Sequence, residues 1–243
     1  AKFQYGVDFD HCIFKGNTIF YKCEFQTICS FEGSSFEGDL SLLLCDFGQA
    51  EFQRCRFAQR VFISACSFKG VAAFDNSEAA ANFTMMKSRF KSTLSLIHFS
   101  ALSLMIKDSI FEVVPDLRGM KPDRPAVLDG NSIRYKKAAG PLGTIFYKAA
   151  NSADAARYRR LRQIATESRD HEEELQYLSY ELRAKRFYST DTASLLANLG
   201  YDLFSGFGRS LFRPVLLFSL SLGVAVLHLV VSHYSQLSTN PLG

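Results

Sequence analysis

The amino-acid sequence predicts a mainly β chain in which a four-sided coil of short strands is followed by two helices and one membrane-spanning helix. Three observations predict this order. The 243 residues include 23 phenylalanines and no tryptophan, which indicates a repeated structural role. In residues 1–115 large apolar residues recur mainly at steps of five or six. Near the C-terminus, Pro214–Val231 is 18 residues long and contains no Asp, Glu, Lys or Arg.

The five-residue spacing defines the coil. A step of five matches neither the helical period of 3.6 nor the strand period of 2. It fits a square coil in which each five-residue unit forms one side and its large residue points inward. Four sides make a turn of roughly twenty residues, and turns stack about 4.8 Å apart through main-chain hydrogen bonds. The predicted core anchors are Phe25, Phe31, Phe36, Phe47, Phe52, Phe57, Phe62 and Phe68.

Cysteines are expected at a second inward position, because all six stand two residues before a phenylalanine. The predicted small inward residues are Cys23, Cys45, Cys55 and Cys66. Four sides per turn would stack Cys23, Cys45 and Cys66 on successive turns. No CxxC pair is present and no histidine recurs at ligand spacing, so we expect reduced thiols and no metal site.

The remaining positions of each side are expected to face water. In the stretch 52–68 these outward residues are Gln53, Arg54, Arg56, Gln59 and Arg60. A rigid coil that presents outward residues in regular lines suits recognition. We therefore expect any binding to occur through such residues.

The run CEFQT, CSFEG, CDFGQ and CRFAQ resembles the pentapeptide-repeat proteins. The resemblance implies a right-handed quadrilateral β-helix over residues 1–115, roughly five turns long. The six-residue steps depart from the family pattern and indicate small bulges at the corners. Residues 116–151 hold several prolines and glycines, so we expect an irregular cap or linker there.

Helical patterns follow. Apolar stripes predict an α-helical hairpin over residues 152–190, with Asp170 as an N-cap and Glu173 at capping-box spacing. The basic run RYRRLR, residues 157–162, is expected to be the solvated face of a helix. Contact with nucleic acid or with anionic lipid headgroups is the alternative for that run.

Residues 191–213 are expected to form an amphipathic juxtamembrane helix, residues 214–234 a transmembrane helix, and residues 235–243 a short external tail. The span is long enough for a bilayer core of about 30 Å. Basic residues precede it, among them Arg209 and Arg213 at the membrane interface, and none follows it. The positive-inside rule then places the N-terminal domain in the cytoplasm. His228 is the predicted polar residue within the membrane.

The hairpin and the FGRSLFRP segment resemble a bacterial subgroup of pentapeptide-repeat proteins that carries a helical linker and C-terminal membrane helices. This resemblance implies a location in the bacterial inner membrane. In some members a further helix and an ion-channel-like pore follow, so the chain is alternatively the cytoplasmic sensing part of a truncated channel-like protein.

No catalytic motif is visible, so we expect a protein that is not an enzyme, with no catalytic residues and no cofactor. The expected function is a membrane-anchored interaction or regulatory scaffold. Its expected partners are the lipid bilayer and an unidentified protein, with a homo-oligomer left open and nucleic acid excluded. Some family members mimic DNA and bind type II topoisomerases, but residues 1–118 carry 12 basic and 13 acidic side chains, a net charge of −1 that disfavours mimicry.

Overall fold

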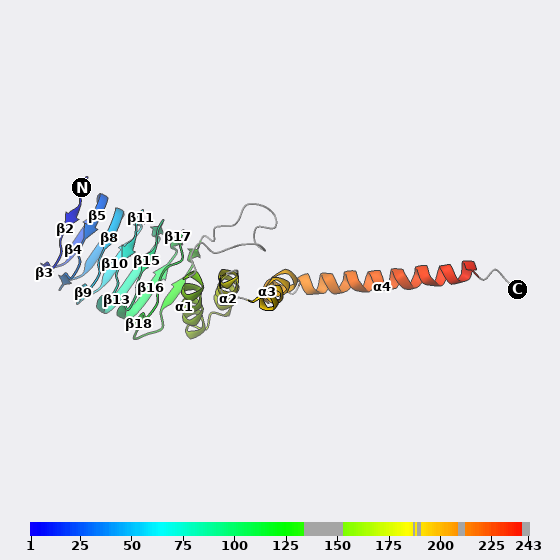
Figure 1. Cartoon of the computed structure of the whole chain (residues 1–243). Helices are drawn as coiled ribbons and strands as arrows, with labels where there is room; N and C mark the ends of the chain where they lie inside the picture. The colour runs from blue at the N-terminus through cyan, green and yellow to red at the C-terminus, as the bar shows by residue number, and fades with distance from the viewer. Residues whose placement is uncertain (134–152, 187, 189–190, 209–211, 240–243) are drawn as a thin grey trace. The chain divides into compact units, whose positions relative to one another are not determined.

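The computed structural model describes residues 1–133, 153–186, 188, 191–208 and 212–239, without the side chains of residues 213 and 232–239. The chain divides into two compact units, Ala1–Lys185 and Arg186–Gly243. The first unit contains the β-helix and the helices α1 and α2. The second contains the helices α3 and α4. Figure 1 shows the elements of each unit.

The first unit is a parallel β-solenoid of about six turns. Its described strands belong to two ten-stranded parallel sheets. They are β1 Lys2–Phe3, β2 Val7–Asp8, β3 Ile13–Phe14, β4 Thr18–Tyr21, β5 Glu24–Ser30, β6 Ser35–Phe36, β7 Leu40–Leu43, β8 Asp46–Glu51, β9 Arg56–Phe57, β10 Val61–Ser64, β11 Ser67–Phe68, β12 Ala72–Ala73, β13 Glu78–Met86, β14 Arg89–Phe90, β15 Leu94–Ser95, β16 Ser100–Lys107, β17 Ile110–Phe111, β18 Lys121–Pro122, β19 Val127–Asp129 and β20 Ser132–Ile133.

The strand register places equivalent residues of successive turns above one another, 21 or 22 positions apart. One such column pairs Phe3 with Phe25, Phe25 with Phe47, and so on through Phe68 and Phe90 to Phe111. The ring centroids in this column are 4.7 to 5.1 Å apart. That distance is close to the spacing of neighbouring strands, so each ring stacks on the ring of the next turn.

Two of the four corners in each turn are left-handed. One series of corners is His11, Gly33, Arg54, Asn76, His98 and Gly119, and the other is Lys22, Leu44, Ala65, Lys87, Asp108 and Gly130, all with φ between 50° and 68°. Both series lie in the five-residue sides. A non-glycine residue in this conformation costs roughly 1–2 kcal/mol, so the stacked core stabilises a strained but regular turn.

The six-residue steps occur in the other two sides, and the predicted bulges appear where the lengths of neighbouring sides differ. Between β5 and β8 the register shifts after Phe25, and between β13 and β16 it shifts after Ala79. The longer side thus holds one additional residue against its neighbour. Gly48 lies below the first bulge, where a Cβ atom would collide with the carbonyl oxygens of Gln26 and Thr27.

Seven of the eight predicted anchors are buried in the core. Phe62 is the exception, because its side chain points outward and the residue is 38% exposed, whereas Val61 and Ile63 on either side of it are buried. Ile63 pairs with Leu42 and with Met85 in the core column. The prediction of Phe62 as an anchor is therefore wrong, since this side has six residues and Ile63 occupies the inward position.

All six cysteines are free thiols. Cys45, Cys55 and Cys66 are buried, whereas Cys23 in the first turn is only half-buried. The Cys55 thiol donates a hydrogen bond to the Phe31 carbonyl at 2.9 Å, and the Cys66 thiol to the Leu42 carbonyl at 3.3 Å. Burial raises the pKa of Cys55 to about 12. The Cys55 and Cys66 thiols therefore satisfy main-chain carbonyls of the preceding turn, and burial holds Cys55 protonated.

The β-helix continues beyond residue 115, where an irregular segment was expected. Strands β18, β19 and β20 extend the parallel ladder to Ile133. Its C-terminal end is covered by the hairpin of α1, Asp154–Glu167, and α2, His171–Lys185. Leu161 and Tyr177 of the hairpin line a small gap together with Leu128 and Ile133 of the last turn. The hairpin thus covers this end of the core, and the expected cap within residues 134–151 lies outside the described residues.

The predicted N-cap of the second helix is confirmed. The Glu173 amide donates to Asp170 Oδ1 at 3.0 Å, which satisfies one of the free amides of the first turn.

The basic run of α1 is largely bound within the protein and does not form a freely solvated face. Arg157 Nε lies 3.2 Å from Oδ2 of Asp116, a carboxylate at the end of the β-helix that is 2% exposed. Arg159 and Arg162 both lie against the buried carboxylate of Glu181, at 3.0 and 3.3 Å. These arginines therefore fix the hairpin to the β-helix and its two helices to each other.

The second unit consists of α3, Thr192–Ser205, and α4, Phe212–Thr239. Within the described residues, α4 contains the one segment long and apolar enough to span a membrane, Pro214–Val231. The hydroxyls of Ser219 and Ser221 donate to carbonyls of the same helix, Val215 at 2.9 Å and Phe218 at 2.8 Å. Such internal pairing is what polar groups need in hydrocarbon.

Candidate recognition face of the β-helix

One side of the β-helix presents an outward surface that we call the β10 face. It is formed by β4, β7, β10, β13, β16 and β19, which pair in parallel from turn to turn. Because neighbouring residues of a strand point to opposite faces, each of these strands directs one residue outward in the same column. In register these residues are Ile19, Ser41, Phe62, Thr84, Met105 and Val127.

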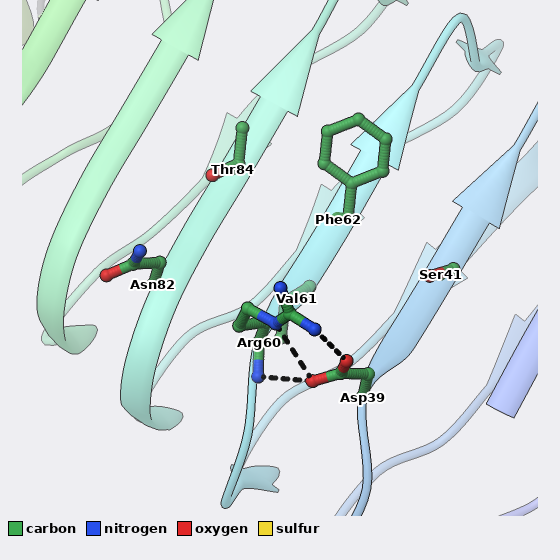
Figure 2. Close-up of a pocket in the computed structure, with 7 residues that line it drawn as sticks. All are labelled: Asp39, Ser41, Arg60, Val61, Phe62, Asn82 and Thr84. Carbon is green, nitrogen blue, oxygen red and sulfur yellow. Dashed lines mark hydrogen bonds and ion pairs between the residues drawn. The ribbon is translucent and has the colours of Figure 1, made fainter. Parts of the chain in front are cut away.

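A shallow depression of about 280 Å³ lies on the β10 face. Its lining residues are Asp39, Ser41, Arg60, Val61, Phe62, Asn82 and Thr84, which come from three successive turns. Figure 2 shows the Phe62 ring standing out from its strand, with Ser41 and Thr84 on the neighbouring strands. The depression therefore combines an exposed aromatic ring with hydroxyl and amide groups.

Arg60 is held in place by Asp39 of the preceding turn. Its Nη2 atom lies 2.7 Å from Asp39 Oδ2, and its main-chain amide donates to Asp39 Oδ1 at 3.1 Å. The hydrogen bond from Arg60 lowers the pKa of the Asp39 carboxyl, so the pair stays ionised at neutral pH. The Arg60 side chain remains 71% exposed, which leaves donors available to a ligand (Figure 2).

Polar side chains bridge the turns beside this pair. The Asp39 amide donates to Asn17 Oδ1 at 3.0 Å, and Ser103 Oγ donates to Asn82 Oδ1 at 2.9 Å. Each of these contacts joins two adjacent turns of the same face, and together they orient Asp39 and Asn82 at the polar edge of the depression.

The depression brings together apolar, charged and polar side chains. A ring, a guanidinium, a carboxylate, two hydroxyls and an amide can pack, stack and hydrogen-bond. Across the described residues, no group of three His, Cys, Asp or Glu side chains is arranged to hold a metal ion.

Of the outward residues predicted in the stretch 52–68, the structure brings Arg60 alone into the depression. Arg54 pairs instead with Glu32. The sequence reasoning assigned Phe62 to the core and missed the other lining residues, which are Asp39, Ser41, Val61, Asn82 and Thr84. Val61, Phe62 and Ile63 form a continuous apolar run, so no apolar–polar alternation in the sequence marks the Phe62 ring as outward.

The predicted membrane residues are only partly visible. Arg209 lies outside the described residues, and so does the side chain of Arg213. His228 lies in α4 with its side chain exposed.

Parallel strands, four inward columns and turns of 21 or 22 residues define the N-terminal domain as a four-sided β-solenoid. Residues 1–46 and 20–66 match the family described as pentapeptide repeats in nine copies. Residues 1–66 are therefore assigned to the pentapeptide-repeat family, and the solenoid that they begin continues past the matched residues to Ile133. Neither the curated proteins nor the solved structures contain a match to the chain.

Proposed function

We propose that the protein is a non-enzymatic interaction scaffold, tethered to a membrane by α4, whose β10 face binds a partner protein. The observation that carries the proposal is the exposed ring of Phe62 beside the Arg60–Asp39 pair, on a surface fixed by stacked turns. Phenylalanine and arginine are both enriched at protein–protein interfaces relative to the rest of the surface.

Rigidity supports the proposal. Val61 and Ile63 are fully packed in the core, so the strand that carries Phe62 has little freedom to move. Arg60 is held by its bond to Asp39 before any partner arrives. Binding then costs little ordering of these side chains, and such preorganisation favours affinity.

The tether is supported by the composition of α4 and by the exposure of its apolar residues. The basic residues before Pro214 favour a cytoplasmic β-helix, and the resemblance to the bacterial subgroup with C-terminal membrane helices favours the bacterial inner membrane. A solenoid anchored in this way is held near other membrane proteins, which raises its effective concentration for them.

The proposal is tested by placing a photo-crosslinking phenylalanine analogue at position 62 of the full chain in cell membranes. We expect a discrete adduct with one partner, and we expect Arg60→Glu to reduce its yield without lowering the amount of folded protein.

The matched control is the same analogue at Val71, which is 37% exposed on a different side of the β-helix. Equal adducts at positions 62 and 71, or none at 62, would contradict a partner on the β10 face.

A further inference from the structure

Helix α3 exposes its apolar face, whereas a surface helix of a water-soluble protein buries it. Leu196, Leu203 and Phe204 are 70%, 54% and 53% exposed. They recur at i, i+7 and i+8, which puts them on one face of the helix. Ala197 and Gly200 lie between them on that face, so the exposed stripe contains no charged group.

The opposite face of α3 is polar and turned inward. Asn198 Oδ1 accepts from Arg186 Nε at 2.8 Å, and Asp202 Oδ2 accepts from Arg186 Nη2 at 2.9 Å. The Arg186 side chain is fully buried, and its guanidinium lies 5.9 Å from the centre of the Phe207 ring. Asp202 is the only charged residue in α3, and this pairing neutralises it.

We propose that α3 lies in the headgroup region of one membrane leaflet, with Leu196, Leu203 and Phe204 inserted toward the acyl chains. The inference rests on the proposed membrane attachment of α4. The occupant of the exposed stripe is the lipid that surrounds the start of the span, because α4 begins seven residues after α3 ends.

Each observation fits this placement. A helix that lies in the interface buries an apolar face several ångströms into the leaflet. The Arg186–Asp202 pair removes the charge that would oppose insertion. Tyr201, 52% exposed at the border of the stripe, has the amphipathic ring that is enriched at headgroup level.

The absence of tryptophan from the chain permits a direct test. Phe204→Trp in the full chain, reconstituted in liposomes, provides a single tryptophan, which is excited selectively at wavelengths longer than the tyrosine absorption band. We expect a blue-shifted emission that loses most of its intensity in lipids brominated near the headgroup and less in lipids brominated near the chain end. Leu196→Trp is the second reporter on the same stripe.

Leu222→Trp, near the middle of the apolar span, is the control for the tether itself. Its emission should be quenched most by bromine near the chain end. If position 222 is quenched and positions 196 and 204 emit as in water, α3 does not lie in the headgroup region, and the proposed membrane attachment by α4 is retained. If no position is quenched, both the tether and the inference fail.

A second copy of the chain could cover the stripe instead. Repeating the measurement at lower protein-to-lipid ratios separates the two occupants, because a stripe buried in a dimer is shielded from the brominated lipid. Quenching that is independent of dilution supports the proposal. Quenching that appears only on dilution identifies another copy as the occupant and overturns it.

Discussion

The β-helix and the C-terminal unit differ in which side chains they bury and which they expose. The β-helix encloses columns of phenylalanine and keeps its charged residues mostly outside. The unit Arg186–Gly243 encloses an ion pair, between Arg186 and Asp202, and exposes leucine, valine and phenylalanine along α3 and α4.

This contrast indicates that the kind of side chain a protein buries depends on whether water or hydrocarbon surrounds it. In water apolar area is removed from solvent, whereas in hydrocarbon it is the polar groups that must be enclosed and paired. One rule therefore accounts for both units once the second is placed in a membrane.

The largest effect is expected from opening the apolar interior of the β-helix. Phe52 is fully buried, and its ring lies between Phe31 at 4.7 Å and Phe74 at 4.9 Å. Phe52→Ala should lower the free energy of unfolding by about 3–5 kcal/mol through the cavity it leaves. Phe62→Ala is the matched control and should cost about 1 kcal/mol or less. Denaturant unfolding of the full chain in detergent measures both, and equal losses would mean that the assignment of faces is wrong.

A somewhat smaller effect is expected from breaking the polar interior of the second unit. Arg186→Met leaves the Asp202 carboxylate buried without its cation, which should destabilise α3 by about 3 kcal/mol. The double variant Arg186→Met/Asp202→Leu removes both charges and should recover most of the loss. Hydrogen exchange of the α3 amides reports the change. An unchanged exchange rate in the single variant would show that the ion pair does not hold α3.

The smallest effect concerns the half-buried Glu173 carboxyl of the hairpin, which lies neither in the apolar interior of the β-helix nor in a buried ion pair. Burial, and then the charge of Asp170, raise the pKa of Glu173 to about 7, with Asp129 and Glu172 adding to the effect. The unfolded value is near 4.3, so the folded state binds the proton more tightly and the free energy of unfolding falls as pH rises from about 4 to 7.

Glu173→Gln should abolish this dependence. At pH 8 we expect the variant to be more stable than the parent by about 1 kcal/mol, after allowing for partial solvent screening, and to match it near pH 4. Thermal unfolding at the two pH values measures the difference. A variant that is less stable at pH 8 would show that the carboxylate is favourable where it lies.

The sequence predicts the β-helix well because each turn repeats the same physical requirement. Phe25, Phe47 and Phe68 are recognisable as core residues since only large inward side chains can fill successive turns. The position of Phe62 was not predictable from spacing, because five-residue and six-residue steps after Phe57 are both allowed. Its neighbours in adjacent turns decide between them, and the register of turns is a tertiary property.

The end of the solenoid and the hairpin show the same limit. The last turn has Leu117, Leu128 and Ile133 at inward positions and contains no phenylalanine, so it lacks the signal that marks the earlier turns. Glu181 of α2 forms ion pairs with Arg159 and Arg162 of α1. No local sequence motif predicts that a carboxylate will be buried by packing between two helices.

The unequal sides of the β-helix have a consequence for how its gene can change. At the bulges in β5 and β13 one additional residue is accommodated between two core positions, while the phase of every later turn is kept. Codon-sized insertions and deletions on these two sides thus leave the interior intact and shift only what is displayed outside. The register shifts between described turns do not fall at the left-handed corners, so we expect the same event there to displace the turns that follow. The number of residues in a side can therefore change during evolution at the bulges, whereas we expect it to be constant at the left-handed corners.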